Sequence, residues 1–245
     1  MKQGIFTITK NTHLTRDVCL MTLKGDATDI TTPGQFINIK LNGKYLRRPI
    51  SVCDAAENEI TIIYKVVGHG TEQMSKMQLG DELDILTGLG NGYDTTLSGD
   101  KPLLIGGGVG VPPLYMLAKE LIDLGKKITV ILGFNTKDEI FYEKEFKDLG
   151  CNVFVTTVDG SYGTKGFVTG VMETLDYSYF YTCGPEPMLK AIYKTSKVSG
   201  ELSFEERMGC GFGACMGCSC KTITGYKRIC KDGPVMKKEE ILWED

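Results

Sequence analysis

The sequence predicts a mixed β and α/β protein: an antiparallel β-barrel, then a parallel-sheet α/β domain, then a small C-terminal module. Three observations predict this fold class. Short strand-like runs fill residues 1–98, strand and helix patterns alternate over residues 99–200, and regular periodicity fades over residues 201–245, where cysteines gather. Many short strands are typical of barrels and sandwiches, whereas alternating strands and helices indicate a parallel sheet with helices on both faces. These three ranges are the predicted domains.

The first domain is expected to contain about six strands and one short helix. Gly, Asn, Asp and Pro separate the strand-like runs and mark the turns between them. The helix is predicted from Thr71, over the segment TEQMSKM. The strand-like runs are GIFTITKN, DVCLMTLKG, GQFINIKLN, RRPISVCD, NEITIIYKVV and DELDILTGL. Their number and spacing favour a small antiparallel barrel or sandwich.

The second domain opens with an apolar run at Pro102–Ile105, which meets a glycine-rich loop and then a helical pattern. A second apolar run follows at Ile128–Leu132, and the strand–helix unit then repeats up to the segment EPMLKAIYKTSKV. Apolar residues recur at helical spacing after the loop, at Leu114, Leu117, Ala118, Leu121 and Ile122. This domain is therefore expected to form a parallel sheet.

The composition argues against several classes of protein. The chain has 245 residues, 42% of them hydrophobic, with a net charge of −3 and a sequence pI of about 5.6. Its lysines and arginines are scattered, so no basic surface for nucleic acid is expected. No apolar run approaches the roughly 18 residues that a membrane span needs, and the first residues lack the apolar core of a signal peptide. A cytoplasmic protein is expected, in which clustered cysteines are more often metal ligands or redox groups than disulfides.

The glycine-rich loop GGGVGVPPL is a candidate phosphate site. It follows a predicted strand and opens a predicted helix, where free backbone N–H groups favour an anion and glycines let it approach closely. The candidate residues are Gly106, Gly108, Gly110 and Pro112. A tight strand-to-helix turn without a ligand is the alternative. The loop also departs from the usual dinucleotide fingerprint, because a proline stands where the third glycine would be.

Two segments of the barrel are further candidates. In RRPIS, an arginine could clamp a pyrophosphate, and the hydroxyl of Ser51 could hydrogen-bond a cofactor ring. Two solvated arginines at a barrel rim are the alternative. Downstream, Gly68, Gly70 and Thr71 precede or open the short helix, which makes them a second possible anion site. Thr71 could equally be an ordinary N-cap, and the two roles are compatible.

The C-terminal cysteines carry the most specific pattern. Cys210, Cys215 and Cys218 have the spacing CxxxxCxxC, and Cys230 follows after eleven residues. This is the plant-type ferredoxin pattern for the ligands of a 2Fe–2S cluster. A structural zinc site or plain thiols are the alternatives, but zinc sites usually use two closely spaced pairs. Cys220 is expected to be a spare thiol rather than a competing ligand.

Another cysteine, Cys183, ends a predicted strand of the α/β domain in the segment YTCGPEPM. Ligands of such sheets bind outside the carboxyl ends of the strands. Cys183 is therefore a candidate neighbour of a nicotinamide.

The order of these motifs resembles a known family. A barrel with RPxS, an α/β domain with GxGxxP and CGP, and a 2Fe–2S tail resemble the ferredoxin reductase superfamily, and within it the PyrK-type electron-transfer subunits of dihydroorotate dehydrogenase B. The resemblance covers the whole chain and is most specific in RRPIS, GGGVGVPPL, CGPEPML and ERMGCGFGACMGCSC. It implies three cofactors: FAD on the barrel, NAD at the α/β domain and a 2Fe–2S cluster in the tail.

The resemblance also implies roles for individual residues. Arg48 would hold the flavin phosphates, and Ser51 and Cys183 would be the catalytic residues, with Ser51 near the reactive ring nitrogen. Superfamily members often have Tyr where Ile50 stands, so the residue that stacks on the flavin is left open. The implied flavin residues are Arg48, Pro49, Ile50, Ser51, Ile63, Tyr64, Lys65, Gly70 and Thr71. The implied NAD residues are Gly106, Gly108, Gly110, Pro112, Cys183, Gly184 and Pro185.

The implied activity is electron transfer in pyrimidine biosynthesis. Electrons from the FMN of a separate, PyrD-type catalytic subunit would pass through the cluster and FAD to NAD⁺, in a heterotetramer with two copies of each subunit. Nicotinamides exchange electrons in pairs and clusters exchange them singly, so the flavin must stand between them. No segment resembles the catalytic subunit, so the chain alone is expected to be inactive on dihydroorotate.

Two alternatives remain open. One is the small subunit of NADH-dependent ferredoxin:NADP oxidoreductase, also described as sulfide dehydrogenase, in which an Asp replaces one cluster Cys. The other is a non-catalytic iron–sulfur redox sensor, which would leave the GxGxxP and CGP segments without a role.

Overall fold

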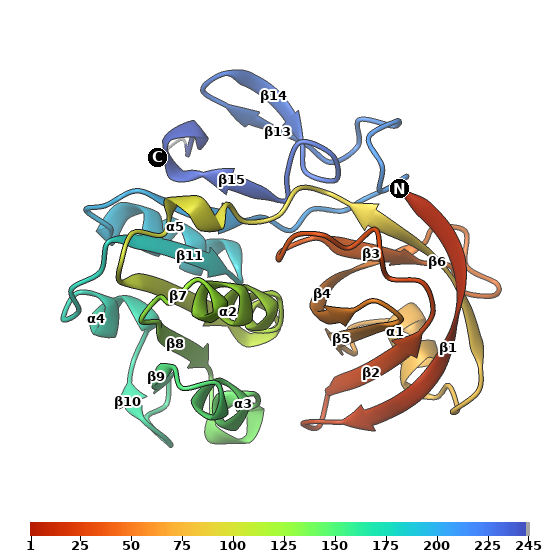
Figure 1. Cartoon of the computed structure of the whole chain (residues 1–245), viewed down its shortest axis with the longest axis horizontal. Helices are drawn as coiled ribbons and strands as arrows, with labels where there is room; N and C mark the ends of the chain where they lie inside the picture. Colours follow the sequence, from red (N-terminus) through yellow and green to blue (C-terminus); the bar gives the residue numbers. More distant parts are fainter. Residues whose placement is uncertain (244–245) are drawn as a thin grey trace.

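The computed structural model describes residues 1–243. Figure 1 shows a β-barrel on one side, a sheet flanked by helices on the other, and a small hairpin above the junction between them. Within the described residues, no helix is both long and apolar enough to cross a membrane.

The barrel is antiparallel and closed, with the strand order β1-β2-β5-β4-β3-β6. Its strands are β1 (Lys2–His13), β2 (Val18–Lys24), β3 (Phe36–Ile39), β4 (Arg48–Ala56), β5 (Glu59–Lys65) and β6 (Glu82–Leu89). Alternate residues such as Ile37 and Ile39 point into the barrel core, as the period of two requires. The predicted barrel is therefore confirmed. The short helix α1 (His69–Ser75) begins two residues before the predicted Thr71.

The second sheet has the order β10-β9-β8-β7-β11-β12-β15 in the described part of the chain. All of its pairs are parallel except the last, between β12 and β15. Its strands are β7 (Pro102–Gly107), β8 (Thr129–Phe134), β9 (Asn152–Thr157), β10 (Thr164–Lys165), β11 (Tyr179–Cys183), β12 (Gly200–Ser203) and β15 (Val235–Lys237).

Helices cover both faces of this sheet, as predicted. The helices are α2 (Pro113–Asp123), α3 (Glu143–Asp148), α4 (Val168–Met172) and α5 (Glu186–Thr195). Successive residues of β7 point to opposite faces: Leu104 belongs to the hydrophobic cluster of α2 and α3, whereas Leu103 and Ile105 belong to that of α4 and α5. One strand therefore supplies both cores. The short 3₁₀ turns are η1 (Thr95–Leu97), η2 (Gly108–Gly110), η3 (Lys137–Glu139) and η4 (Lys238–Glu240).

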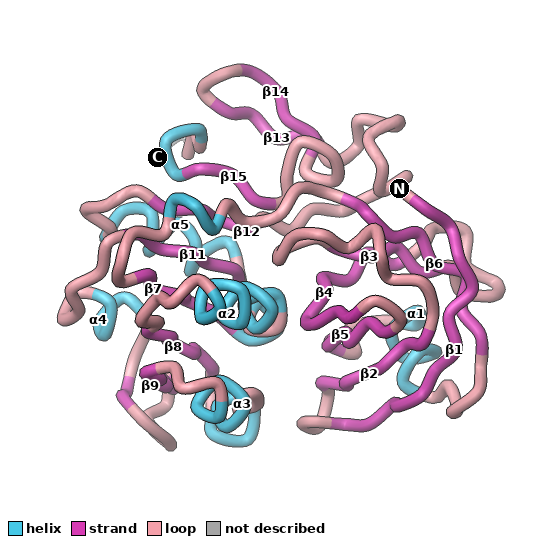
Figure 2. Tube along the Cα trace, in the orientation of Figure 1, coloured by secondary structure: helices cyan, strands magenta, loops and turns pink. Residues whose placement is uncertain are grey.

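The C-terminal tail is attached to the parallel sheet at both of its ends. The expected boundary between residues 200 and 201 falls inside β12, and the tail returns as β15 at the edge of the same sheet. Between them lie an irregular segment, residues 204–218, and the hairpin of β13 (Ser219–Thr222) and β14 (Gly225–Arg228) (Figure 2). The division into three domains stays a proposal, with the tail fixed to the second domain.

The barrel packs on the α/β domain through α2 (Figure 1). Val18 and Ile63 of the barrel share a hydrophobic cluster with Val111 and with the apolar side of α2. At the edge of this contact, the ammonium of Lys119 lies 2.8 Å from the carboxylate of Asp54 in β4. The glycine-rich loop that precedes α2 is thereby placed beside the barrel.

Candidate functional site

The GxGxxP and CGP segments lie against each other at the carboxyl edge of the parallel sheet. The strands pair so that Cys183 lies beside Gly106. A Cβ atom built on Gly110 would lie 2.2 Å from the carbonyl oxygen of Cys183, so the two backbones touch and only glycine fits. Gly184 has a φ of +157° and packs on the backbone of Gly107. The structure therefore brings the two predicted halves of the NAD site together.

The loop between β7 and α2 keeps an open backbone. Gly108 has a φ of +52°, and a Cβ built there would meet nothing within 4 Å. Pro112 is the N-cap of α2, and Pro113 is the first helical residue, where a missing N–H costs nothing. An accessible backbone at the start of an eleven-residue helix, beside the carboxyl ends of parallel strands, suits a dinucleotide phosphate.

Cys183 is half-buried at the end of β11. Burial raises the pKa of its thiol to about 12, although hydrogen bonds with Ser203 and the Gly184 backbone oppose the shift. The side chain is therefore a neutral thiol at physiological pH rather than a thiolate nucleophile. Its proposed role is to contact a nicotinamide, not to form a covalent bond. Pro185, the N-cap of α5, completes this edge of the loop.

The barrel brings Arg48 and Gly70 together from different segments. Arg48 opens β4, and Gly70 lies in the first turn of α1. A Cβ on Gly70 would lie 2.3 Å from Nε of Arg48, so the guanidinium rests directly on the glycine. Arg48 also donates a hydrogen bond to the carbonyl of Leu46. Two residues predicted to bind the flavin phosphates thus share one corner of the barrel.

Thr71 has a local structural role in addition to any ligand contact. Its buried hydroxyl accepts hydrogen bonds from the backbone N–H groups of Val67, at 2.9 Å, and Gly68, at 3.3 Å. It also donates to the carbonyl of Gly68. The side chain therefore shapes the loop before α1, and a contact of Thr71 with a phosphate would come from its backbone.

The remaining flavin candidates differ in accessibility. Ile63 and Tyr64 of β5 are buried, and the hydroxyl of Tyr64 donates to Asn11 inside the barrel. Lys65 pairs with Asp17 at 3.1 Å. Pro49, Ile50 and Ser51 are half-buried along β4. Ile63 and Tyr64 could line a flavin through their backbones, whereas the β4 residues present part of their side chains.

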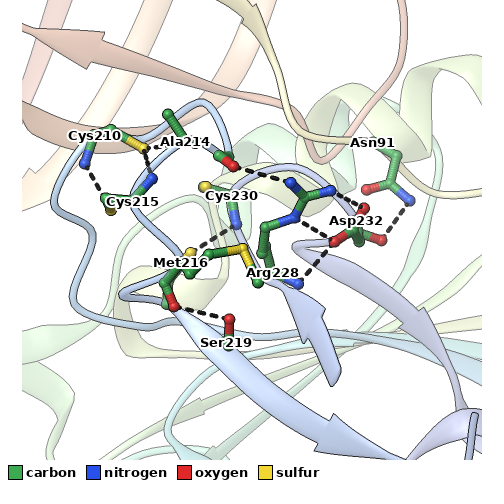
Figure 3. A network of polar contacts seen from close by, with 11 residues as sticks. Asn91, Cys210, Ala214, Cys215, Met216, Ser219, Arg228, Cys230 and Asp232 are labelled. Atoms are coloured by element: carbon green, nitrogen blue, oxygen red, sulfur yellow. Dashed lines mark hydrogen bonds and ion pairs between the residues drawn. The ribbon is translucent and has the colours of Figure 1, made fainter. Parts of the chain in front are cut away.

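The four predicted cluster ligands lie as two pairs: Cys210 with Cys215, and Cys218 with Cys230, which follows β14 by two residues. Figure 3 labels Cys210, Cys215 and Cys230. Sγ of Cys210 accepts contacts from the N–H groups of Ala214, at 3.2 Å, and Cys215, at 3.4 Å. Sγ of Cys218 lies 3.4 Å from the N–H of Cys230. Burial opposes ionisation of Cys210, but N–H donors from Phe212, Cys215 and Ala214 outweigh it and lower its pKa to about 6.

This donor set fits a cluster with two irons. Each iron of a 2Fe–2S cluster takes two thiolates, and backbone N–H groups aimed at sulfur stabilise their negative charge. Within residues 1–243, no group of three or more His, Cys, Asp or Glu side chains gathers around one metal position. Cys220 lies on β13, where burial raises the pKa of its thiol. That it is a spare thiol stays a prediction.

An arginine holds the cysteine loop in shape. Nη1 of Arg228 donates to the carbonyl of Gly213 at 2.9 Å, and the rest of its guanidinium pairs with Asp232, lowering the pKa of that carboxyl (Figure 3). Nδ2 of Asn91, just after β6, donates to the carbonyl of Asp232 at 3.1 Å. The cluster loop is therefore tied to the segment that joins the barrel to the sheet.

Three residues beside the site received no role of their own from the sequence. Tyr45, three residues before Arg48, is fully exposed. Arg47 donates from Nη1 to the carbonyls of Asn38 and Asp84, at 3.2 and 2.9 Å. Asn38, in turn, reaches the cysteine loop. The position of Arg47 beside Arg48 in RRPIS could have indicated that it belongs to the site. No residue near Asn38 in the sequence gives such an indication.

Fold and site together define a class of protein: oxidoreductases of the ferredoxin reductase type that carry an added iron–sulfur domain. Two family models match the chain accordingly. The oxidoreductase NAD-binding domain matches residues 104–194, and the iron–sulfur cluster binding domain of dihydroorotate dehydrogenase B matches residues 205–242.

Curated relatives identify the family within this class. The electron transfer subunit of dihydroorotate dehydrogenase B (NAD(+)) from Fusobacterium nucleatum is 46% identical, over 98% of this chain and 99% of its own length. The subunit of the same name from Bacillus pumilus is also 46% identical, over 98% of each chain. The chain belongs to the family of electron transfer subunits of dihydroorotate dehydrogenase B.

Solved structures agree on the fold. An NADH-dependent reduced ferredoxin-NADP oxidoreductase, described in the context of flavin-based electron bifurcation, matches with a TM-score of 0.89 and 32% identity, over 98% of this chain and 90% of that one. The FAD/NAD-binding domain of nitric oxide dioxygenase from Vibrio cholerae matches with a TM-score of 0.70 and 22% identity, over 82% of this chain and 99% of that one. The second match supports the fold alone.

Proposed function

We propose that the chain is the electron-transfer subunit of an NAD-dependent dihydroorotate dehydrogenase B in pyrimidine biosynthesis. It passes electrons from the FMN of a separate catalytic subunit to NAD⁺, and FAD, a 2Fe–2S cluster and NAD are its cofactors. One observation carries the proposal: strand β3 lies between the flavin strand and the cluster loop. Phe36 of β3 pairs with Ser51 of β4, and Asn38 of the same strand bonds the carbonyl of Cys210.

Each cofactor is bound by its own set of residues. Bound FAD exchanges electrons in pairs with the nicotinamide and singly with the cluster. Arg48 and the backbone near Gly70 hold the flavin phosphates, and Ser51 orients the flavin ring. The loop from Gly106 to Pro112 holds the NAD phosphates, with Cys183, Gly184 and Pro185 beside the nicotinamide. The cluster ligands are Cys210, Cys215, Cys218 and Cys230.

The partner is an FMN-containing catalytic subunit of the PyrD type, in a cytoplasmic heterotetramer with two copies of each subunit. Exposed apolar side chains on the cysteine loop and on the hairpin that follows it support such a partner, because a surface that stays in water seldom concentrates them. Phe212, Met216 and Tyr226 are 42%, 54% and 73% exposed. A partner seated here would bring its flavin close to the cluster.

Two observations favour this function over the small subunit of NADH-dependent ferredoxin:NADP oxidoreductase. The chain is more similar in sequence to the dihydroorotate dehydrogenase B subunits, and all four cluster positions are cysteines. The redox-sensor alternative is disfavoured because the glycine loop touches the CGP segment and keeps an open backbone at Gly108, an arrangement that a sensor would not need.

The first prediction tests this function by anaerobic co-purification from the native cell. We expect a second subunit that contains FMN, and a complex that forms NADH when given dihydroorotate and NAD⁺. The chain alone, loaded with FAD and cluster, should oxidise NADH with ferricyanide but form no orotate. A partner without FMN, or a complex that exchanges electrons only between ferredoxin and NADP(H), would contradict the proposal.

A further inference from the structure

Asn38 of β3 is a buried amide that the proposed chemistry does not use. It is 1% exposed, and its Nδ2 donates a hydrogen bond of 3.2 Å to the carbonyl of the cluster ligand Cys210. Its Oδ1 is a buried side-chain oxygen with no partner among the described residues. An unpaired buried amide oxygen carries a desolvation penalty, so a residue selected for stability alone would not be an asparagine.

The orientation of this amide is determined by its acceptor. The carbonyl of Cys210 needs a donor, so rotating the amide by half a turn would place one oxygen against another. The cluster sulfurs also accept hydrogen bonds rather than donate them, so they cannot satisfy Oδ1. The arrangement therefore keeps the hydrogen bond to Cys210 and leaves Oδ1 of Asn38 without one.

Gly211 completes the contact. It has a φ of +79°, and a Cβ built on it would lie 2.2 Å from Nδ2 of Asn38. The amide of Asn38 thus packs on the α-carbon of Gly211 while it bonds the preceding carbonyl. Because a peptide unit is rigid and planar, these two contacts fix the orientation of the Cys210–Gly211 peptide. The next residues of the loop supply the N–H groups that converge on Sγ of Cys210.

The other side of Asn38 faces the flavin strand. Its α-carbon pairs with that of Pro49 in the ladder between β3 and β4. Its carbonyl accepts from Arg47, whose guanidinium also binds Asp84 at 2.9 Å. Arg47 immediately precedes Arg48, the proposed phosphate clamp. Asn38 therefore lies between the flavin strand and a cluster ligand, bonded on both sides.

We infer that Asn38 is the positioning residue that fixes the cluster loop against the flavin strand, through its hydrogen bond to the carbonyl of Cys210. This inference rests on the proposed function. Asn38 thereby sets the separation between flavin and cluster. It also sets the direction of the N–H groups that surround one cluster sulfur. The number and direction of such donors tune the reduction potential of a cluster.

The second prediction tests this role with Asn38→Leu, which keeps the approximate shape of the side chain and removes both polar atoms. Because the unpaired Oδ1 is also removed, we expect thermal stability at or above that of the wild type. We expect the EPR g-values of the reduced cluster to shift. Reduction of the cluster by NADH through the flavin, followed by stopped-flow absorbance, should slow at least tenfold. NADH oxidation by ferricyanide should stay within about twofold of the wild type.

A second variant and a control separate positioning from stability. Asn38→Ala removes the same hydrogen bond without adding a charge, so it should give the same spectral shift even if it lowers the melting temperature. The control is Gln35→Met, which removes a buried amide bonded to the carbonyl of Gly90, at 3.2 Å, in the residue just before β3. It should lower the melting temperature and leave the cluster spectrum and its reduction rate unchanged.

Wild-type g-values and cluster reduction rates in both Asn38 variants would overturn the inference. A matching change in Gln35→Met would also overturn it, because the effect would then follow general destabilisation. These readouts use the loaded chain without dihydroorotate or partner, whereas the proposed function is tested by orotate formation. A failure of one is therefore distinguishable from a failure of the other.

Discussion

At the scale of single residues, Arg48 is held in place before any ligand binds. It rests on Gly70 and donates to the carbonyl of Leu46, so little side-chain entropy remains to be lost on binding an anion. A guanidinium fixed in this way presents its planar N–H groups to a phosphate without first searching for a rotamer. Gly70 permits this placement because any larger residue would displace the guanidinium.

The third prediction is that Arg48→Ala weakens FAD binding by about 1.5–3 kcal/mol, the usual size of a charged hydrogen bond, or roughly 10- to 150-fold in dissociation constant. Arg48→Lys should lose less, because the charge stays while the two-pronged geometry is lost. Flavin release measured by fluorescence would show this. Arg16→Ala, an exposed arginine of the same barrel, is the control. Flavin bound as tightly in Arg48→Ala as in the wild type would place the clamp elsewhere.

The sequence pointed to those candidate residues whose chemistry is visible in a local pattern. Glycine spacing and the cysteine pattern pointed to the two loops, and the structure places Gly110 on Cys183 and the cysteines in two pairs. The sequence did not predict the role of Asn38, because its partner, Cys210, is 172 positions away and nothing near Asn38 indicates that contact. The N-cap alternative for Thr71 is wrong in position: the N-cap of α1 is Gly68, and the Thr71 hydroxyl accepts from the N–H groups of Val67 and Gly68 from the third helical position.

At the scale of elements, β11 and β12 hold the segment that connects the barrel to the parallel sheet. The hydroxyl of Tyr181 donates to the carbonyl of Asp94 at 2.9 Å, and that of Tyr93 donates to the carbonyl of Thr182 at 3.1 Å. The backbone N–H of Asp94 donates to the carboxylate of Glu201 at 2.9 Å. These hydrogen bonds fix the connecting segment to the sheet. Because the barrel is joined to the sheet through this segment, the two short strands also help to orient the barrel.

Glu201 makes this connection sensitive to pH. The side chain is 4% exposed, and burial raises its pKa from 4.5 to about 7 despite the hydrogen bond from Asp94. The folded protein then holds a proton that the unfolded chain releases near pH 4.5. The protonated Glu201 carboxyl therefore contributes its full stabilisation below about pH 4.5, and this contribution is lost as the pH rises through about 7. Asp94, Lys237 and Glu240 are the charged groups that face this carboxyl.

The fourth prediction is that Glu201→Gln removes this dependence while keeping an acceptor for the Asp94 N–H. Between pH 6 and pH 8.5, the wild type should lose about 1 kcal/mol of stability relative to the variant, or about 2–4 °C in melting temperature. Thermal unfolding of both proteins across this range checks it. Glu173→Gln, at an exposed position beside α4, should follow the wild type. Parallel curves for wild type and Glu201→Gln would show that the buried carboxyl does not titrate in this window.

Strand β12 is an element that sequence patterns could not predict. Gly200–Ser203 is a strand of four residues, too short for a periodic signal, and its partner β15 lies about thirty residues later, beyond the cysteine loop. The six barrel strands and the longer strands of the sheet were predictable because each has its own alternation or apolar run. The attachment of the tail to the sheet was not, because it is decided by pairing between distant segments.

At the scale of the whole molecule, the barrel contacts both of the other candidate sites. Its strands β2 and β5 pack against the nucleotide loop, and β3 contacts the cluster loop. In the proposed pathway the flavin residues of the barrel therefore lie next to both the NAD loop and the cluster loop. We propose that the NAD half and the cluster half of the pathway meet at the flavin, so a variant should be able to separate them.

The fifth prediction makes that separation with Cys215→Ser. A serine oxygen is a poor replacement for thiolate on iron, so the visible absorbance and iron content of the cluster should be lost while FAD remains. NADH oxidation by ferricyanide should stay near wild type, because it needs only the nucleotide loop and the flavin. Formation of NADH from dihydroorotate with the catalytic partner should fall at least 100-fold. Cys220→Ser, on the neighbouring hairpin, should keep both activities. An unchanged iron content in Cys215→Ser would contradict the ligand assignment, and equal loss of both activities would show that the two halves are not separable at the flavin.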